Sequence, residues 1–244
     1  MGSPAAHLKP DGWLAQRLGR DTYRLTVDET LLSPAGDAAR EGLLAVLNKP
    51  VFVYCKVSPT FMEGLRFLHK HEFRLVDTNV IFEKKPHLDR EAEDDSRVRL
   101  AKPADRIATI ELARKGFGYS RFHLDPEIPR ETANRIKADW VAAYFAGTRG
   151  HQMVVVEVEG AVVGFLQLLR AADEALVIDL IAVDERYRCR GLGGEMIAFV
   201  ESRAGSAPIL RVGTQIANTA SIRFYEGLGF RMTEAQYVFH YHHA

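Results

Sequence analysis

The sequence predicts an α/β protein with a mixed, twisted sheet, and three observations support this class. Apolar β-rich runs alternate with amphipathic segments along most of the 244 residues. Two of these runs are joined by Glu159-Gly160, a hairpin signal that argues against a purely parallel sheet. A glycine-rich turn follows the run that ends at Val183, as at the start of an anion-binding helix.

Composition excludes several classes of partner. Hydrophobic residues make up 47% of the chain and the formal net charge is zero, so nothing favours nucleic acid or a membrane surface. No apolar run has the length of a membrane span, and the first residues lack the pattern of a secretory signal. Two cysteines, Cys55 and Cys189, cannot build a disulfide framework. We therefore expect a cytoplasmic protein.

The chain divides at a polar segment, residues 86–97, which we interpret as a linker. Residues 1–90 are then a smaller N-terminal α/β extension and residues 91–244 a second domain. The elements expected in the extension are a strand at 51–57, a helix at 58–70 that Ser58 caps with Pro59 just inside, and a strand at 74–84.

The second domain has the predicted order β-α-α-β-β-β-α-β-α-β. Its helix at 129–146 carries Ala133, Ile136, Trp140 and Tyr144 on one apolar face, and its helix at 219–227 has Asn218 as a good N-cap. The expected elements after the strand at 99–100 are helices at 104–115 and 129–146, strands at 153–158, 161–169 and 175–183, a helix at 194–203, a strand at 209–215, a helix at 219–227 and a strand at 235–241.

Two segments of the chain resemble each other without gaps. Phe73-Arg74-Leu75 aligns with Phe230-Arg231-Met232, and Asn79-Val80-Ile81-Phe82 aligns with Gln236-Tyr237-Val238-Phe239. Both segments follow a predicted helix. The extension is therefore either a partial copy of the helix–strand end of the second domain, without its glycine turn, or a coincidental match between two helix–strand units.

The glycine turn, Arg188 to Gly194, selects among phosphate-binding loops by its spacing. No Lys-Ser/Thr follows the glycines, which excludes a nucleoside-triphosphate loop, and the third glycine of a dinucleotide fingerprint is missing. Arg188-x-x-Gly191-x-Gly193 after a strand resembles the Q/R-x-x-G-x-G/A loop of the GCN5-related N-acetyltransferase (GNAT) family. An ordinary glycine-rich turn is the alternative. The resemblance implies an acetyl-CoA site at Ile181, Ala182, Val183, Arg188, Cys189, Arg190, Gly191, Leu192, Gly193 and Gly194, with Cys189 as a small turn residue rather than a nucleophile.

A second segment, Asn218 to Phe230, resembles the part of the family that lines the other side of the cofactor. Asn218 and Tyr225 are seven residues apart and share a helix face. The resemblance implies that Asn218 contacts the pantetheine arm and that Tyr225 is the general acid that protonates the leaving thiolate. A plain helix cap and a packed aromatic residue are the alternatives. The family fold also implies that the strands ending at Val183 and Gln215 splay apart.

The substrate follows from a closer resemblance within the family. Phe117 to Phe122 with the helix of Trp140, and Val212 to Gln215 with Asn218 to Ala220, resemble members that acetylate the amine of a TDP-linked 4-amino-4,6-dideoxyhexose. This implies direct transfer from acetyl-CoA to a nucleotide-linked amino sugar. The expected acceptor residues are Tyr119, Ser120, Arg121, Phe122 and His123, with a packed loop as the alternative.

Several points stay open at this stage. Asp179 is a candidate general base, His123 is a second, and water chains can replace both. The alternative functions are acetylation of an aminoglycoside, a polyamine or a protein N-terminus, a non-catalytic CoA-binding module, and a structural protein that assembles through the extension. The extension is also a candidate surface for a homodimer. His240-Tyr241-His242-His243 has no third ligand of evident spacing, so we expect a solvated chain end and no metal.

Overall fold

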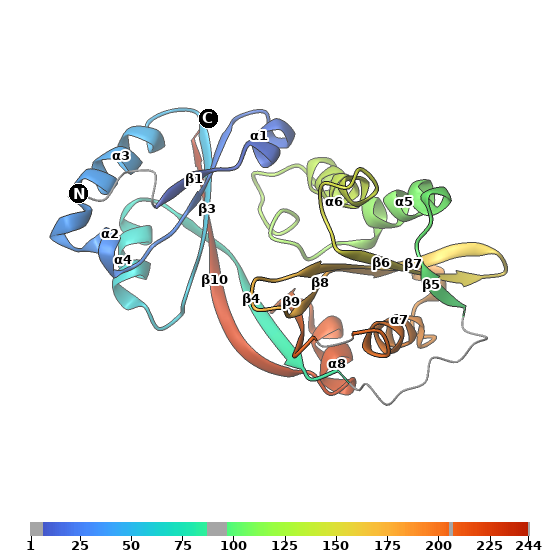
Figure 1. Cartoon of the computed structure of the whole chain (residues 1–244). Helices are drawn as coiled ribbons and strands as arrows, with labels where there is room; N and C mark the ends of the chain where they lie inside the picture. The colour runs from blue at the N-terminus through green and yellow to red at the C-terminus, as the bar shows by residue number, and fades with distance from the viewer. Residues whose placement is uncertain (1–6, 87–96, 205–206, 244) are drawn as a thin grey trace.

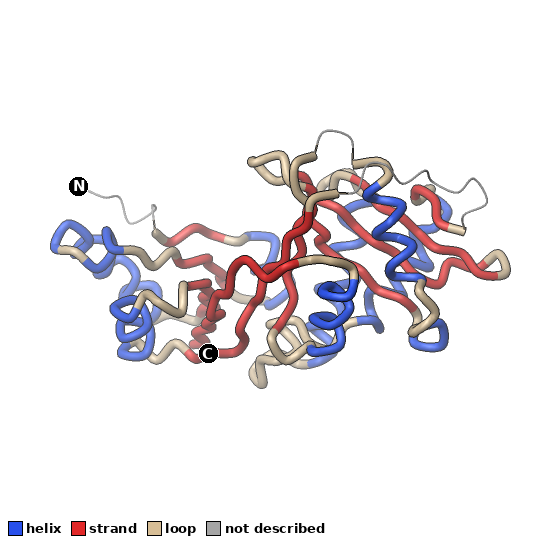
Figure 2. Tube along the Cα trace, turned by 90° about the horizontal axis from the view of Figure 1, so that it is seen from below, coloured by secondary structure: helices blue, strands red, loops and turns tan. Residues whose placement is uncertain are grey.

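One ten-stranded mixed sheet organises the protein. The computed structural model describes residues 7–86, 97–204 and 207–243. The sheet has the strand order β1-β2-β3-β10-β4-β9-β8-β7-β6-β5, and it runs through both halves of the molecule (Figures 1 and 2). The predicted α/β class with a mixed sheet is confirmed. The proposed boundary at residue 90 lies outside the described residues.

The described part of the N-terminal half contributes four strands and four α-helices. Its strands are β1 (Leu8–Pro10), β2 (Asp21–Leu25), β3 (Val51–Val57) and β4 (Arg74–Lys84). The C-terminal half begins with the short edge strand β5 (Val98–Leu100), which pairs with β6. The helices of the N-terminal half are α1 (Gly12–Leu18), α2 (Glu29–Leu32), α3 (Asp37–Leu47) and α4 (Met62–Lys70). The side chains of Asp11 and Asp28 cap α1 and α2 by accepting from backbone N–H groups.

The C-terminal half follows the predicted order. Its strands are β6 (Gln152–Val158), β7 (Ala161–Arg170), β8 (Leu176–Val183), β9 (Leu210–Gln215) and β10 (Arg231–His243). Its helices are α5 (Arg106–Gly116), α6 (Arg130–Phe145), α7 (Leu192–Glu201) and α8 (Thr219–Gly227). Glu159 and Gly160 both have positive φ, at 52° and 78°, which is the backbone that a tight hairpin between β6 and β7 requires. The hairpin prediction is therefore confirmed.

Helices cover both faces of the C-terminal part of the sheet (Figure 1). α5 and α6 lie on one face, where Val155, Phe165 and Leu180 form a buried core with them. α7 and α8 lie on the other face, over a larger core that includes Phe82, Leu166, Met196 and Tyr225. Successive side chains of β8 therefore point alternately toward the two helical layers, and side chains of both layers can reach this strand.

The parallel strands β8 and β9 separate after a short pairing. They pair only at Leu176↔Leu210, Val177↔Arg211 and Ile178↔Val212. Asp179 is an extra residue at this point, because Leu168 pairs with Ile178 while Gln167 pairs with Leu180. Such a β-bulge bends its strand and increases the local twist. The predicted splay is confirmed, and it leaves the edge of β8 from Asp179 to Val183 without a partner in β9.

The two halves exchange strands across the centre of the sheet. β4 lies between β10 and β9, and β10 lies between β3 and β4, with antiparallel pairing throughout. The register between β4 and β10 is symmetric with respect to the alignment of the two segments. Arg231 pairs with Glu83, and the residues that match them in the alignment, Arg74 and His240, pair with each other. Asn79 and Gln236, which the alignment of the two segments matches, face each other.

The helices before these strands and a second pair of strands also correspond between the two halves. α4 and α8 have equal length, and their bounds lie at the same offset as Phe73 and Phe230. β2 pairs with β3 in parallel, as β8 does with β9. Strand directions and neighbours therefore agree with the interpretation of the N-terminal half as a partial copy.

The end of the chain differs from the prediction. β10 extends to His243 instead of 241, and His240 is completely buried. The expectation of a solvated chain end was wrong, because β10 is an interior strand whose partners on both sides are β3 and β4. Among the described residues, no helix combines the length and the hydropathy that crossing a membrane requires.

Candidate active site

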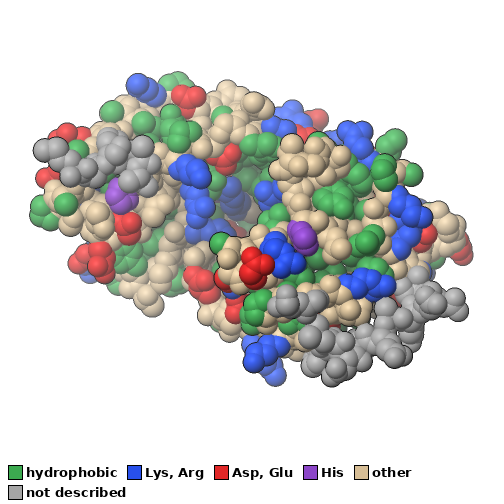
Figure 3. All heavy atoms as spheres, in the orientation of Figure 1, with side chains coloured by type: hydrophobic (Ala, Val, Ile, Leu, Met, Phe, Trp, Pro, Cys, Tyr) green, Lys and Arg blue, Asp and Glu red, His purple; other side chains and the backbone are tan. Residues whose placement is uncertain are grey.

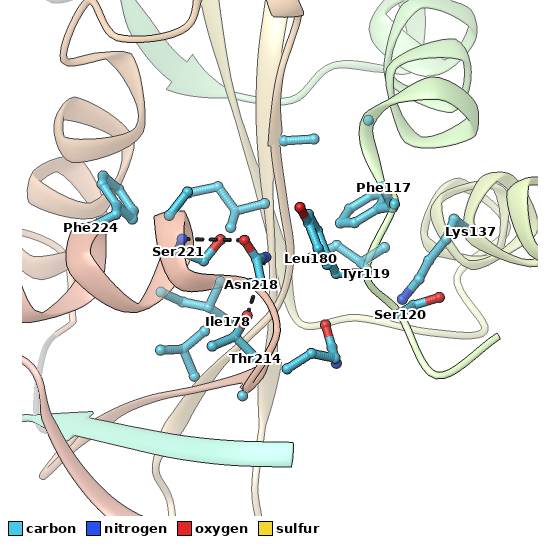
Figure 4. Close-up of a pocket in the computed structure, with 18 of the residues that line it drawn as sticks. Phe117, Tyr119, Ser120, Lys137, Ile178, Leu180, Thr214, Asn218, Ser221 and Phe224 are labelled. Carbon is cyan, nitrogen blue, oxygen red and sulfur yellow. Dashed lines mark hydrogen bonds between the residues drawn. The ribbon is translucent and has the colours of Figure 1, made fainter. Parts of the chain in front are cut away.

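A cavity of about 860 Å³ lies where β8 and β9 separate. Its walls come from the ends of these strands, the turn before α7, the start of α8, the segment from Lys115 to Phe122, α6, and strands β3 and β4 of the N-terminal half. Figure 4 shows Asn218, Ser221 and Phe224 on one side of β8 and Phe117, Tyr119 and Lys137 on the other. This volume falls in the range typical of small-molecule and cofactor sites.

The turn before α7 has the geometry of an anion-binding loop. Gly191 is the N-cap of α7 with a φ of 81°, and Cys189 also has a positive φ, of 59°. The Arg188 side chain donates from Nε to the carbonyl oxygen of Val183 at 3.0 Å, which closes the turn onto the end of β8. A Cβ at Gly193 would lie 2.9 Å from the tip of the Phe224 ring, so a larger residue there would require that ring to move. The free N–H groups of the first turn of α7 therefore stay accessible to an anion.

Most of the residues predicted for the site line this one cavity. Arg190, Gly194 and His123 are predicted residues that do not line it. The predicted residues that do are Tyr119, Ser120, Arg121, Phe122, Asp179, Ile181, Ala182, Val183, Arg188, Cys189, Gly191, Leu192, Gly193, Asn218 and Tyr225.

Asn218 and Tyr225 belong to α8, on the far side of the sheet from α6. Asn218 caps the helix through Oδ1, which accepts from the Ser221 N–H at 3.3 Å, and its Nδ2 donates to Thr214 Oγ1 at 3.4 Å. Tyr225 is only 3% exposed and lies among the rings of Phe82, Phe224 and Phe230. Burial raises the pKa of Tyr225, so its hydroxyl stays protonated at neutral pH.

Asp179 is held in an ion pair. Arg149 donates to its two carboxylate oxygens at 2.9 and 2.7 Å, and Gln167 Nε2 donates to Oδ2 at 3.2 Å. These contacts leave few lone pairs for an acceptor amine. The role of Asp179 as a base therefore stays a prediction that its surroundings do not favour.

Arg121 presents a guanidinium to the cavity without an ion-pair partner in the described part of the chain. The group lies 3.9 Å from the Tyr54 ring centroid and 4.4 Å from that of Phe122, and Nη1 is 3.2 Å from His240 Nε2. Tyr54 in turn donates to Asp11 Oδ2 at 2.9 Å. Arg121 is therefore positioned by rings and by a neutral imidazole rather than by a carboxylate.

His240 and His242 form a buried cluster with Asp125. Asp125 Oδ2 lies 2.5 Å from His240 Nδ1 and 2.7 Å from His242 Nε2. Burial acts to raise the pKa of Asp125, but bonds from both imidazoles and the Glu127 N–H together outweigh it and hold that pKa well below its usual range. Burial lowers the pKa of His240 to about 4. The three side chains offer ligand atoms within 4.8 Å of one another. Both imidazoles bond to the same oxygen of Asp125, whereas the buried Nδ1 of His242 has no hydrogen-bond partner among the described residues. We assign no metal here.

The cavity is also lined by residues that sequence reasoning did not identify, and these include four polar residues of β3, β4 and α6. Lys56, Asp77 and Asn79 come from β3 and β4, and Lys137 comes from α6. Only Lys137 left a signal in the sequence, because it lies four residues after Ala133 and three before Trp140, on the apolar face of its helix. The other three reach the cavity through the strand exchange, which no local pattern reveals.

Comparison with known proteins identifies the family to which this geometry is similar. The model of the acetyltransferase (GNAT) family matches residues 108–230, half of the chain. The spore coat polysaccharide biosynthesis protein SpsD of Bacillus subtilis is 32% identical over 140 residues, which are 57% of this chain and 48% of that protein. The dTDP-fucosamine acetyltransferase of Escherichia coli is 30% identical over 148 residues, 59% of this chain and 62% of that protein. The chain thus spans less than two thirds of either relative.

Solved structures share the fold. A conserved protein of unknown function from Staphylococcus epidermidis has a TM-score of 0.64 at 14% identity and covers 94% of this chain and 88% of its own. A GCN5-related N-acetyltransferase from Sphaerobacter thermophilus has a TM-score of 0.57 at 15% identity, over 90% and 72%. A tandem GNAT protein from the clavulanic acid biosynthesis pathway has a TM-score of 0.57 at 12% identity, over 90% and 74%.

Proposed function

The chain belongs to the acetyltransferase (GNAT) family, and we propose that it transfers an acetyl group from acetyl-CoA to the amine of a nucleotide-linked amino sugar. Acetyl-CoA supplies the acetyl group as a thioester, whose carbonyl carbon an amine can attack. The residues of the cavity fit this donor. The glycine turn and the first turn of α7 offer N–H groups for its pyrophosphate, and the unpaired edge of β8 offers backbone groups for the amides of its pantetheine arm.

The transfer needs an acid for the leaving sulfur, and Tyr225 is the proposed one. Its hydroxyl is protonated at neutral pH because burial raises its pKa. Its helix lies on the same face of the sheet as α7, whose N-terminus is the proposed pyrophosphate site (Figure 1). The acceptor then approaches from the opposite face, between α6 and the N-terminal half.

The observation that carries the choice of acceptor is a set of cations without anionic partners. Lys56, Arg121 and Arg130 line the cavity, and none of them lies within ion-pair distance of a carboxylate among the described residues, although the charge of Asp77 in the same wall acts on Lys56. Figure 3 shows Lys and Arg side chains around the hollow between the two halves. Cationic side chains that face a cavity unpaired recognise an anionic ligand such as a diphosphate.

This lining also separates the proposed acceptor from the alternatives. Aminoglycosides and polyamines are polycations, which Lys56, Arg121 and Arg130 would repel. The relatives' names point in the same direction, since one acts on a dTDP-linked amino sugar by name and the other serves polysaccharide biosynthesis. We therefore place the proposed reaction in the biosynthesis of a polysaccharide.

The test is thiol release from acetyl-CoA with a panel of acceptors. We expect turnover with a TDP- or UDP-linked amino sugar and little with the same amino sugar lacking the nucleotide, an aminoglycoside, a polyamine or a peptide. Release with those controls alone would reject the nucleotide sugar and keep the acetyltransferase. Acetyl-CoA binding without release to any acceptor would favour a non-catalytic module.

A substitution sharpens the test of the diphosphate. Arg121→Ala should raise the KM for the nucleotide sugar by roughly 10- to 100-fold, the loss expected for a charged hydrogen bond, and leave the KM for acetyl-CoA unchanged. Arg135→Ala is the control, because Arg135 donates to the Arg17 carbonyl on the surface and does not line the cavity. Equal KM values for Arg121→Ala and the wild type would exclude Arg121 from acceptor binding.

A further inference from the structure

Lys137 is a buried lysine that no group in the described structure neutralises. It is 7% exposed, and none of its described neighbours gives it a hydrogen bond or an ion pair. Its Nζ lies 4.2 Å from the Trp140 ring centroid and 5.1 Å from that of Phe117. Figure 4 shows the side chain reaching from α6 into the cavity, with its Nζ beside Ser120. Buried lysines are normally paired, so this one needs an explanation.

The natural partner of Lys137 is occupied. Asp179 is the acidic group whose charge acts on it, but both oxygens of Asp179 accept from Arg149. Two cations, Arg121 and Arg149, disfavour a second positive charge nearby, and the half-buried ring of His123 is also within electrostatic reach. Burial is the largest effect, and it lowers the pKa of Lys137 to about 7. A substantial fraction of the amine is therefore neutral at physiological pH.

We propose that Lys137 is the general base of the transfer. As the acceptor nitrogen forms its bond to the acetyl carbon, it becomes positively charged, and one of its N–H bonds breaks while a new N–H bond forms at Lys137 Nζ. The acceptor leaves as a neutral amide and Lys137 as an ammonium, which returns its proton to solvent. The C–S bond of the thioester breaks, Tyr225 gives its proton to the departing thiolate, and the resulting tyrosinate takes a proton back from solvent, so the protons balance. The inference rests on the proposed acetyl transfer but not on the nucleotide.

The position of Lys137 fits this role. It stands on α6, on the face of the sheet opposite α8, so the base and the proposed acid Tyr225 approach the gap between β8 and β9 from opposite sides (Figures 1 and 4). α6 packs against α5, and the end of α5 lies tightly on β8, because a Cβ at Gly116 would lie 2.9 Å from that of Ala182. The base thus stands on a helix and lines the same cavity as the unpaired edge of β8. A base whose pKa is near the working pH is also the most effective.

Lys137 could instead bind an anionic group of the acceptor, and two substitutions distinguish this role from that of a general base. Lys137→Arg keeps the positive charge but cannot act as a base near neutral pH, and Lys137→Met keeps neither property. We expect both to lower kcat by about 10²- to 10⁴-fold with little change in the KM for acetyl-CoA, and to remove the acid limb of the pH–rate profile near pH 7. Lys102→Arg and Lys102→Met, on an exposed lysine outside the cavity, are the matched controls. Retention of kcat by Lys137→Arg would overturn the proposal.

Asp77 is the competing base, because it lines the same cavity and burial raises its pKa to about 6. An acid limb that disappears in Asp77→Asn and persists in Lys137→Arg would also overturn the proposal. Acetyl-CoA binding by each variant establishes that the site is folded.

A second measurement needs no acceptor, and it separates failure of this inference from failure of the proposed function. Nζ resonances of ¹⁵N-lysine-labelled protein should include one that titrates near pH 7 and vanishes in Lys137→Arg. If the resonance that vanishes in Lys137→Arg titrates above pH 9, Lys137 is not a base, whatever the acceptor. A resonance near pH 8 that persists in this variant is expected for Lys56, whose pKa burial lowers to about 8. If the resonance is present but no nucleotide sugar is acetylated, the assignment of the acceptor is at fault, and the kinetic comparison is made with the amine that the panel identifies.

Discussion

Tyr225 is enclosed by three phenylalanine rings, and its hydroxyl is the part of the side chain with a chemical role. Tyr225→Phe keeps the rings packed and removes the proton that the leaving thiolate takes. We expect kcat to fall by about 10²- to 10⁴-fold while the KM for acetyl-CoA stays within a factor of about two. Steady-state kinetics checks this, with Tyr23→Phe in the N-terminal half as the control. An unchanged kcat would remove Tyr225 from the chemistry.

Gly191 has a conformation that other residues rarely adopt, and the shape of the proposed pyrophosphate loop depends on it. Gly191→Ala at a φ of 81° should cost about 1–2 kcal/mol of strain, which the loop relieves by moving its N–H groups. We therefore expect weaker acetyl-CoA binding by calorimetry together with a lower melting temperature.

Gly160 offers the matched control for this substitution. Its φ is 78°, but it lies in the hairpin between β6 and β7, away from the cavity. Gly160→Ala should lower the melting temperature to a similar degree without changing acetyl-CoA affinity. If both variants bind acetyl-CoA as the wild type does, the loop does not hold the pyrophosphate.

At the scale of an element, β10 joins the two halves through a buried pH-sensitive residue. The pKa of His240 is about 4 in the folded protein and about 6.5 in the unfolded chain, so the unfolded state binds more protons as the pH falls. The contribution of His240 is present above pH 6.5 and is lost between pH 6.5 and 4, about 3 kcal/mol in all. Below pH 4 protonation of Asp125, whose pKa is lowered in the fold, continues the loss.

Urea unfolding at a series of pH values measures this effect. The free energy of unfolding should fall steadily from pH 6.5 to 4 in the wild type. His240→Gln, which does not titrate in this range, should be less stable at pH 7 but show a flatter curve. Parallel curves for the two proteins would mean that His240 is already charged in the fold.

Local patterns sufficed for the elements whose causes are local. The cap at Asn218, the glycine turn before α7 and the Glu159-Gly160 hairpin each depend on neighbours within a few residues, and each was predicted at its place. The same holds for β4, whose bounds match the prediction. Elements before residue 50 carry weaker signals and were not assigned.

Contacts between distant segments escaped prediction for a physical reason. Asp125 and His240 are 115 residues apart, and nothing in either segment specifies the other. Lys56 reaches the cavity because β3 pairs with β10, and Asp77 because β4 is inserted between β9 and β10. The sequence does indicate that Lys137 lies on an apolar helix face and is buried. Its lack of an ion-pair partner could not be predicted, because it depends on the ion pair between Arg149 and Asp179.

At the scale of the whole molecule, the two halves are mechanically inseparable although we propose that they are copies of one unit. β4 pairs with β9 and β10, and Lys84 at its end forms a buried ion pair of 2.7 Å with Glu201 of α7. Cleavage at a protease site inserted between residues 86 and 97 should leave both fragments associated in size-exclusion chromatography, with acetyl-CoA binding retained.

Residues 97–244 expressed alone are the companion test. They would expose the edges of β9 and β10 that β4 covers, so we expect aggregation rather than a soluble domain. Separation of the cleaved fragments without denaturant, or a soluble isolated fragment that binds acetyl-CoA, would show that the halves are independent domains.

The strand exchange also means that the binding sites of the two substrates come from different parts of the sequence. The half that lacks a glycine turn supplies Lys56, Asp77 and Asn79 to the cavity, while the donor loop lies wholly in the other half. Substitutions in the first third of such a chain can therefore change the acceptor that is bound without altering the loop that binds acetyl-CoA. Lineages of such proteins should therefore diversify by their N-terminal strands.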